Sequence, residues 1–467
     1  MLIFKSKLLV SLVILMLVLT ACVTPSVEQT QEAPEVEQPT NPVVEEATEP
    51  VVEKPTEPVT VKIWTFLNPD NTSPREVVFK QIIDQFELDN PNVTILVEPQ
   101  PYREMGPKWL AQMELDDKTA ADILWLDIGI GLEAANRGFL ADLNPLFLDD
   151  WSEEDQNDFF LKLLERGKYG TDSQYSLGVW PTGGYMLYAR ADWLEEAGAQ
   201  LPIETWTWDE FIEIAQNMTK DVTGDGIVDQ WGLAWTGTAP FNDMPVEFKL
   251  LEAEGGLWDD SCKALYDTPS GFDAMQFQVD LVNKFKVTPP EIVTYSLEDA
   301  QEQFVSGRYG MIINTTGRFS TVKGLVTWDK EDLVMLPWPT DDGSQTGPVF
   351  LEAWDVGVRA NSPVVKEAAK FVEALFSKEA ALLWAEVGGQ LPNRPSVISD
   401  DFFSQPANQY LKVIIDSINN WSYVRPGCNQ DGYLDDLGLA YQEILVNNVS
   451  IEEAMTNAAK AFNDRQE

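Results

Sequence analysis

An alternation of strand and helix patterns constrains the fold of this chain from residue 59 onward. Residues 59–66 alternate apolar and polar side chains as a strand does, and residues 93–97 repeat that pattern after an Asn-Pro-Asn stop at 90–92. Between them, apolar side chains recur at helical spacing at Phe79, Ile82, Ile83 and Phe86. Strand–helix–strand spacing of this kind predicts α/β layers with parallel strands.

The alternation of predicted strands and helices continues to the C-terminus. Strands are predicted at 121–127, 175–181 and 185–188, and helices at 131–137, 191–198, 368–375 and 451–462. Thr207 and Glu210 form a predicted capping box that opens a further helix. No repeat of 20–50 residues is visible, which argues against solenoids, propellers and an obvious TIM barrel.

Charge and the missing histidine exclude several classes of function. The 467 residues hold 32 Lys+Arg against 76 Asp+Glu, a net charge of −44, and no His. Such a chain is not expected to bind nucleic acid or anionic lipid, because both contacts depend on Lys and Arg. Without His, Ser-His-Asp triads, Cys-His pairs and His-ligated zinc are excluded, whereas carboxylate chemistry such as that of glycosidases is not.

The N-terminus has the pattern of an export signal followed by a spacer. Residues 1–21 carry two lysines and then a short apolar run, as a secretory signal does. The sequence Leu19-Thr20-Ala21-Cys22 resembles a bacterial lipobox, whose Cys is acylated, and the alternative is an ordinary signal with an incidental Cys. Residues 22–59 are rich in Pro and Glu and are expected to form an extended acidic tether.

Two further cysteines remain, Cys262 and Cys428. In an exported chain two cysteines more often form a disulfide than stay free, so we predict this bridge, with two free thiols as the alternative. A catalytic thiol is not expected, because no His is present to activate it.

Several short segments occur in an order that is specific as a set. They are Val61-Lys-Ile-Trp64, Asn90-Pro91-Asn92-Val93, Gly138-Phe139-Leu140, Glu195-Glu-Ala-Gly198, Leu250-Leu-Glu-Ala-Glu-Gly255-Gly256, Phe304-Val-Ser-Gly307-Arg-Tyr-Gly-Met311 and Gly388-Gly-Gln-Leu-Pro392-Asn-Arg394. This set resembles the family 1 extracellular solute-binding proteins, the sugar-binding lipoproteins of ABC importers that are related to maltodextrin-binding proteins. The resemblance covers essentially all of residues 60–467.

The resemblance implies an α/β, two-lobed periplasmic-binding-protein-like fold of type II, with a ligand cleft between lobes joined by crossing hinge segments. By analogy the N-terminal lobe is 60–177 plus 357–395, and the C-terminal lobe is 178–356 plus 396–467, which places Cys262 and Cys428 in one lobe. It also implies an extracytoplasmic, monomeric and non-catalytic substrate-binding subunit. Such a subunit is held on the outer face of the cytoplasmic membrane by its lipid alone, and delivers a carbohydrate, expected to be an oligosaccharide, to ABC permease subunits.

The expected ligand contacts come from two arguments. A sugar site needs flat rings for the apolar sugar faces and fixed polar groups for the hydroxyls, and three of the 16 Trp lie where predicted strands end: Trp180, Trp235 and Trp354. The resemblance adds Asn68, Tyr102, Asp127, Tyr185, Asn314, Arg318, Glu352, Arg394 and Asp435. Arg318 and Arg394 have plain salt bridges as their alternative role, and Asp435 has that of a solvated helix acid.

One acidic loop is similar to a calcium site. Asp221, Asp225 and Asp229 occupy positions 1, 5 and 9 of such a loop, but Gly232 replaces the closing Glu at position 12. We therefore predict a surface turn without metal, keep a structural calcium as the alternative, and expect no other cofactor.

Two other functions stay open at this point. A surface glycosidase would use a pair of carboxylates, which the abundance of acids neither reveals nor excludes. The same fold also suits a non-sugar solute, such as a peptide, polyamine or polyol derivative. A phosphorylated ligand would need clustered Arg or Lys, and the sequence shows no such cluster.

Overall fold

The computed structural model describes residues 57–115, 118–126, 128–182, 184–238, 244–397, 400–424, 428 and 432–466. The predicted leader, Cys22 and nearly all of the tether lie outside these residues, and so does Asp127. Among the described helices, none is both long and apolar enough to cross a membrane.

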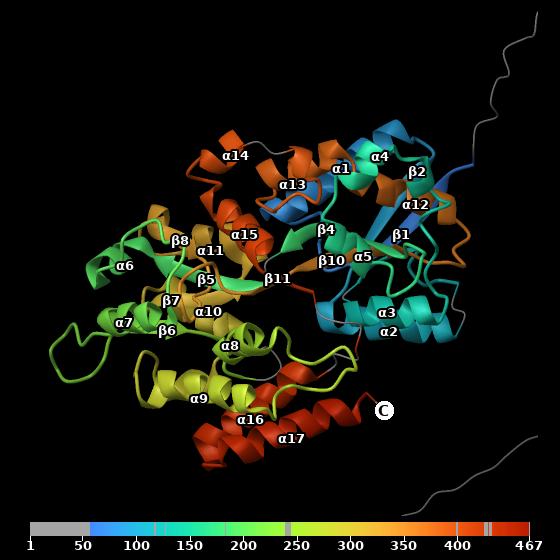
Figure 1. Ribbon diagram of the computed structural model, residues 1–467. Helices are drawn as coiled ribbons and strands as arrows, with labels where there is room; N and C mark the ends of the chain where they lie inside the picture. The colour runs from blue at the N-terminus through green and yellow to red at the C-terminus, as the bar shows by residue number, and fades with distance from the viewer. Residues whose placement is uncertain are drawn as a thin grey trace, which may run out of the picture. The chain divides into compact units, whose positions relative to one another are not determined.

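The first lobe is built on a five-stranded sheet with the strand order β2-β1-β3-β10-β4 (Figure 1). Its strands are β1 (Val59–Thr65), β2 (Val93–Pro99), β3 (Ile123–Leu126), β4 (Ser176–Thr182) and β10 (Glu352–Val358). β1 pairs in parallel with β2 and β3, which confirms the predicted parallel strands. β10 returns from the second lobe and runs antiparallel to both β3 and β4.

Helices cover this sheet on both faces. They are α1 (Pro74–Asp89), α2 (Tyr102–Glu114), α3 (Ile128–Asn136), α4 (Glu153–Asn157), α5 (Leu161–Arg166), α12 (Val365–Leu375) and α13 (Lys378–Glu386). α1 packs with α12 and α13, whereas α2 packs with α3 on the other side in Figure 1. The predicted apolar face of α1 is confirmed, because Phe79, Ile82, Ile83 and Phe86 are all buried.

The second lobe has its own four-stranded sheet, in the order β6-β7-β5-β8. The strands are β5 (Tyr185–Arg190), β6 (Trp231–Ala234), β7 (Tyr309–Thr315) and β8 (Leu333–Leu336). β6 and β7 are parallel, and β5 runs antiparallel to β7 and β8. Buried side chains form one hydrophobic cluster in each lobe, so each sheet has its own core.

The helices of the second lobe are α6 (Ala191–Ala197), α7 (Trp208–Met218), α8 (Pro245–Glu254), α9 (Pro269–Asn283), α10 (Leu297–Val305), α11 (Phe319–Leu325), α14 (Asp400–Ser404), α15 (Gln409–Asn420), α16 (Tyr433–Asn447) and α17 (Ile451–Asp464). The predicted capping box at α7 is confirmed: Glu210 N donates to Thr207 Oγ1 over 3.1 Å, and Thr207 N donates to Glu210 Oε2 over 2.7 Å. Short 3₁₀ turns are η1 (Leu148–Asp150), η2 (Pro290–Thr294), η3 (Thr316–Arg318), η4 (Lys330–Asp332) and η5 (Pro395–Val397).

The chain passes between the two sheets three times. β4 leads through Gly184 into β5, the short strand β9 (Val349–Phe350) leads into β10, and the segment around η5 leads to α14. Gly184 has φ +65°, and a β-carbon there would meet Phe350 Cβ at 3.0 Å, so glycine is required at this crossing. β9 pairs with β11 (Ser422–Tyr423) in a two-stranded parallel ribbon beside the crossings.

Candidate functional site

The topology brings the carboxyl end of β1, that of β3 and the amino end of β10 to one edge of the first sheet. β1 and β3 are parallel, and β10 is antiparallel to β3, with Asp355 opposite Leu126. Ligands of α/β sheets bind beyond the carboxyl ends of the strands. The crossing segments leave from this same edge, which makes it the candidate site.

Three aromatic side chains stand together at this edge. The ring of Trp354 lies 4.5 Å from that of Phe66 and 5.0 Å from that of Tyr102, measured between centroids. Phe66 and Trp354 are partly exposed, and Tyr102 is 40% exposed. We call Phe66, Tyr102 and Trp354 the aromatic wall, since together they present accessible ring surface of the kind that packs on apolar sugar faces.

Strand β10 is irregular at Trp354. The pairing of β10 with β4 shifts register between Ala353 and Asp355, and such irregularities bend a strand and re-aim its side chains. Arg166 at the end of α5 holds this stretch, because Nη2 donates to Ala353 O over 3.1 Å and lies 3.0 Å from Asp355 Oδ2. Both charged side chains are almost fully buried, so the backbone on either side of Trp354 is fixed.

The loop that carries Asn68 is organised by Glu76 of α1. The Glu76 carboxylate accepts hydrogen bonds from Asn68 N at 3.1 Å, Asn71 Nδ2 at 2.8 Å and Ser73 Oγ at 2.7 Å. Burial opposes the ionised form of Glu76, but these hydrogen bonds and the charge of Arg75 together outweigh burial and lower its pKa. Asn68 itself is partly buried, and its Oδ1 accepts from Asp70 N at 3.0 Å.

The corresponding edge of the second sheet carries Tyr185 and Arg318. Tyr185 opens β5 opposite Thr315, the last residue of β7, and η3 with Arg318 follows directly. Tyr185 is partly buried, and its carbonyl accepts from Trp338 Nε1 at 2.9 Å. Arg318 Nη2 donates to Glu298 Oε1 over 3.3 Å, with the side chain 34% exposed.

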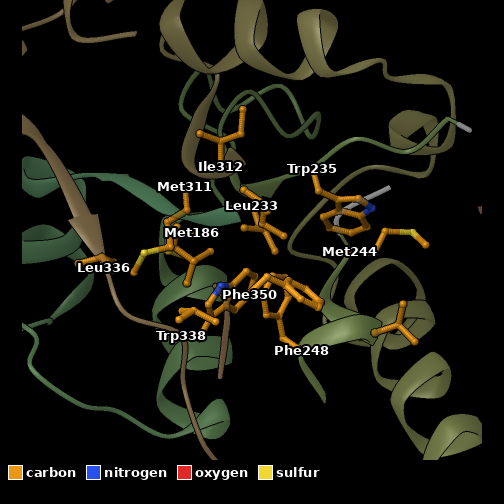
Figure 2. Packing of buried hydrophobic residues seen from close by; sticks show 14 of the residues in the cluster. Met186, Leu233, Trp235, Met244, Phe248, Met311, Ile312, Leu336, Trp338 and Phe350 are labelled. Atoms are coloured by element: carbon orange, nitrogen blue, oxygen red, sulfur yellow. The ribbon is translucent and has the colours of Figure 1, made fainter. Parts of the chain in front are cut away.

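Two of the predicted tryptophans lie in the cores instead of at a cleft. Trp180 is 1% exposed, with its ring 5.3 Å from Trp125 and 4.7 Å from Trp384. Trp235 is 0% exposed, and Figure 2 shows it beside Met244 among the packed side chains of the second lobe. Trp180 lies within β4 and Trp235 directly follows β6, and neither ring has an exposed side for a ligand in this structure.

Asn314 and Arg394 are buried polar residues with structural partners. Asn314 Nδ2 donates to Gln301 Oε1 over 3.2 Å, which joins β7 to α10. Arg394 lies beside the rings of Trp151 and Phe159, which stack on each other, with Cζ 4.8 and 4.4 Å from their centroids. Arg394 Nε donates to Phe376 O over 2.6 Å, and Nη1 lies 3.4 Å from Asp155 Oδ1. The salt-bridge alternative for Arg394 is therefore what the structure contains.

The two remaining acids occupy different lobes. Glu352 is partly buried at the first position of β10, opposite Thr182, at the same edge as the aromatic wall. Asp435 is partly buried in the first turn of α16, next to Asp436, which pairs with Arg465. None of the contacts found among the described residues brings Asp435 to the aromatic wall.

The acidic loop folds around its own carboxylates. Asp221 accepts hydrogen bonds from the backbone of Gly224 and Gly226, at 2.6 and 2.7 Å, and Asp229 accepts from Val222 and Thr223, both at 2.9 Å. Asp225 Oδ1 accepts from Ile227 N at 2.8 Å. Over the described ranges, no group of three or more Asp, Glu or Cys side chains is placed to hold a metal ion.

Cys262 and Cys428 are joined by a disulfide in the second lobe. Cys262 follows α8, and Cys428 precedes α16, so the bridge ties two segments separated by 166 residues.

Sequence reasoning missed two members of the site, Phe66 and Arg75. Phe66 directly follows β1, so the rule that selected aromatic residues at strand ends could have found it. Arg75 follows Pro74 at the start of α1 and carries no local signal of its position, because it approaches Gly317 of the other lobe.

Known proteins share this architecture. The maltose-bound MalE3 of T. maritima matches with a TM-score of 0.70 and 25% identity, over 87% of this chain and 99% of that chain. The GacH receptor of Streptomyces glaucescens, solved unliganded and with acarbose, matches with a TM-score of 0.71 and 20% identity, over 88% and 99%. These likenesses confirm the predicted two-lobed α/β fold.

Sequence comparison agrees with the structural likeness. A binding protein of Brucella abortus (strain 2308) is 21% identical over 331 residues, which is 71% of this chain and 76% of the relative. The family described as bacterial extracellular solute-binding protein matches residues 81–409. The match covers most of the chain, which therefore belongs to the family of bacterial extracellular solute-binding proteins.

Proposed function

We propose that this protein is the extracytoplasmic substrate-binding subunit of an ABC import system and that its ligand is a carbohydrate. The observation that carries the proposal is the aromatic wall of Phe66, Tyr102 and Trp354 at the edge from which the lobes are crossed. Family membership and structural neighbours solved with maltose and acarbose support it.

The chemistry of the wall suits a sugar ring. Sugars present C–H faces ringed by hydroxyls, and partly exposed aromatic rings pack on such faces at little conformational cost. Asn68 and Glu352 lie at the same edge and would supply polar groups for the hydroxyls. Tyr185 and Arg318 supply polar groups from the second lobe.

Binding without chemical conversion is the proposed mechanism. The ligand contacts both lobes, so it stabilises the arrangement in which they are closed around it. The three crossings at Gly184, at β9–β10 and around η5 are the segments that would absorb this motion. The closed, loaded form is then recognised by the permease, which receives the sugar unchanged.

The proposal includes attachment to the membrane. Cys22 would carry the lipid, and residues 23–59 would hold the folded lobes of a monomeric receptor away from the outer face of the cytoplasmic membrane. We expect the wild-type protein in the membrane fraction of the cells that make it and Cys22→Ala in the soluble fraction. Equal partition of the two proteins would contradict the lipid anchor.

Tryptophan fluorescence of the full-length protein, titrated with neutral mono- and oligosaccharides, tests the ligand class. We expect saturable binding at micromolar or lower concentration and recovery of intact sugar by chromatography. Trp354→Leu should weaken binding about tenfold, since an aromatic contact contributes about 0.5–1.5 kcal/mol beyond its buried area.

Trp328→Leu is the matched control, because Trp328 is also partly exposed but lies against Phe304 and Arg190 of the second lobe. Its sugar affinity should equal that of the wild type. Both affinities are measured by calorimetry, because the loss of one tryptophan would change the fluorescence signal. Equal losses in Trp354→Leu and Trp328→Leu would contradict the aromatic wall. Release of a cleaved sugar would contradict binding alone.

A further inference from the structure

Arg75 belongs to the first lobe, but its guanidinium lies against the second. Nη1 is 3.7 Å from the point that a β-carbon on Gly317 would occupy, and Gln390 Oε1 is 3.5 Å from the same point. Arg75 Cζ also lies 5.9 Å from the centroid of the Phe66 ring. Arg75 therefore lies between the aromatic wall and η3.

The hydrogen-bonding capacity of Arg75 is unused. No hydrogen bond or ion pair joins its guanidinium to any residue in the part of the chain that the structure describes. Its neighbour Glu76 accepts hydrogen bonds from Asn68, Asn71 and Ser73, and it acts on Arg75 through its charge without a direct hydrogen bond. A partly buried guanidinium with five N–H donors is a strong site for an acceptor that carries negative charge.

A second positive charge stands close to it. Burial lowers the pKa of Arg75, and the charge of Arg318 lowers it further, by more than Glu76 raises it. Arg318 follows Gly317 directly, and Arg75 Nη1 lies beside Gly317. Two like charges in a partly desolvated place repel each other unless an anion lies between them.

The two arginines differ in their pairing, although the charge of one carboxylate acts on each of them. Arg318 is paired with Glu298, whose side chain is 73% exposed, at 3.3 Å. Arg75 forms no hydrogen bond or ion pair with the described residues, so its N–H donors suit a ligand group with a single negative charge. A carboxylate has that charge and matches the planar fork of a guanidinium with two parallel hydrogen bonds.

We propose that the ligand is an acidic sugar, an oligosaccharide that contains a uronic acid, and that Arg75 and Arg318 bind its carboxylate from the two lobes. The inference rests on the proposed function and adds the class of sugar to it. The sugar ring packs on the aromatic wall while its carboxylate reaches Arg75, which lies over the Phe66 ring of that wall. Because each lobe supplies one cation, the carboxylate also favours closure.

The strong negative charge of the chain does not oppose this assignment. At physiological ionic strength charges farther away than about 8 Å are largely screened. Within that distance Glu298 pairs with Arg318 and the charge of Glu76 acts on Arg75, while the two guanidinium groups supply the N–H donors for the carboxylate.

The test compares acidic disaccharides with their neutral methyl esters, which have the same rings and linkage. Calorimetry on the full-length protein would use disaccharides of galacturonic, glucuronic and mannuronic acid, each ester, and maltose. We expect one acid to bind about 10- to 100-fold more tightly than its ester, the range of a charge-assisted hydrogen bond. Arg75→Gln should lose this preference for the acid over its ester, and Arg75→Lys should retain part of the preference.

Arg137→Gln is the matched control, since Arg137 is an exposed arginine of the first lobe that pairs with Glu114 and Glu133. It should keep the preference for the acid. Equal or tighter binding of the esters or of maltose would overturn the acidic-sugar inference and leave the proposed function standing. Failure of every sugar, acidic and neutral, to bind would overturn both.

Discussion

Arg359 Nη2 donates a hydrogen bond to Asp122 Oδ1 over 2.8 Å, and both side chains are almost completely buried. The same carboxylate accepts from Ser362 Oγ at 2.7 Å and from Lys62 N at 2.9 Å. Asp122 thereby joins β1, the start of β3, the end of β10 and the loop before α12. It fixes the edge of the first sheet that lies opposite the candidate site.

Removal of this carboxylate should destabilise the protein strongly. Asp122→Ala leaves the buried Arg359 without its counter-charge, and breaking a buried pair in this way costs about 3–5 kcal/mol. The measurement is the free energy of unfolding from urea titration followed by circular dichroism. Asp84→Ala is the control, since Asp84 forms an exposed pair with Lys80 and should change stability by about 0.5 kcal/mol or less. Similar losses in the two variants would contradict the role of Asp122.

Arg394 should act on stability and not on ligand affinity. Arg394→Gln removes the cation that lies beside the stacked rings of Trp151 and Phe159 and leaves the partly buried Asp158 without its counter-charge, at a cost of about 3 kcal/mol. Lys378→Gln also takes a cation from Asp155, but Lys378 is 43% exposed and its loss should be small. Sugar affinity, measured where each variant is folded, should stay at the wild-type value. A variant of normal stability with weakened binding would return Arg394 to the ligand site.

Local patterns made much of the fold predictable. The helical spacing of Phe79 to Phe86 and the capping box of Thr207 and Glu210 depend only on neighbouring residues, and the structure contains both. The exact crossing points depend on the pairing of distant strands. β4 stays in the first sheet up to Thr182, and β10 joins it from Glu352, so the strands extend a few residues past the expected boundaries at 177 and 357.

The site could be predicted only in part, because exposure is a tertiary property. The criterion of an aromatic residue at a predicted strand end selected Trp180, Trp235 and Trp354 equally well. Trp384 of α13 covers Trp180, whereas the pairing of β10 shifts register at Trp354. Neither the contact nor the register shift can be predicted from the neighbouring residues in the sequence. Arg75 and Arg318 are far apart in the chain, so the cationic pair that the sequence did not reveal follows from the packing of the two lobes.

Reduction of the disulfide should lower the stability of the second lobe. The bridge between Cys262 and Cys428 closes a loop of 166 residues, and the loss of chain entropy on crosslinking such a loop corresponds to about 5 kcal/mol in the unfolded state. Cys262→Ser with Cys428→Ser should shift the unfolding midpoint downward and make it insensitive to dithiothreitol. A wild-type midpoint that dithiothreitol does not change would contradict a stabilising bridge.

Glu76 should give the protein a stability that depends on pH. Burial raises its pKa, but hydrogen bonds from Ser73, Asn68 and Asn71 and the charge of Arg75 together lower it below the ordinary value of 4.5, so the folded state favours the ionised form. This stabilisation is complete above pH 4.5 and is lost as pH falls through the lowered pKa of the folded state. Glu76→Gln should therefore be less stable than the wild type by about 1–2 kcal/mol at pH 7, with a difference that shrinks on acidification below the ordinary value.

The measurement is the unfolding free energy of both proteins from pH 7 down to pH 3. Glu204→Gln is the control, since Glu204 is an exposed loop residue to which the described residues offer no hydrogen bond, and its difference from the wild type should stay small throughout. The loop from Asn68 to Ser73 depends on the ionised carboxylate, so sugar affinity of the wild type should fall over the same pH range. A stability difference between Glu76→Gln and the wild type that grows on acidification would contradict the lowered pKa and, with it, the role of Glu76 in ordering the loop.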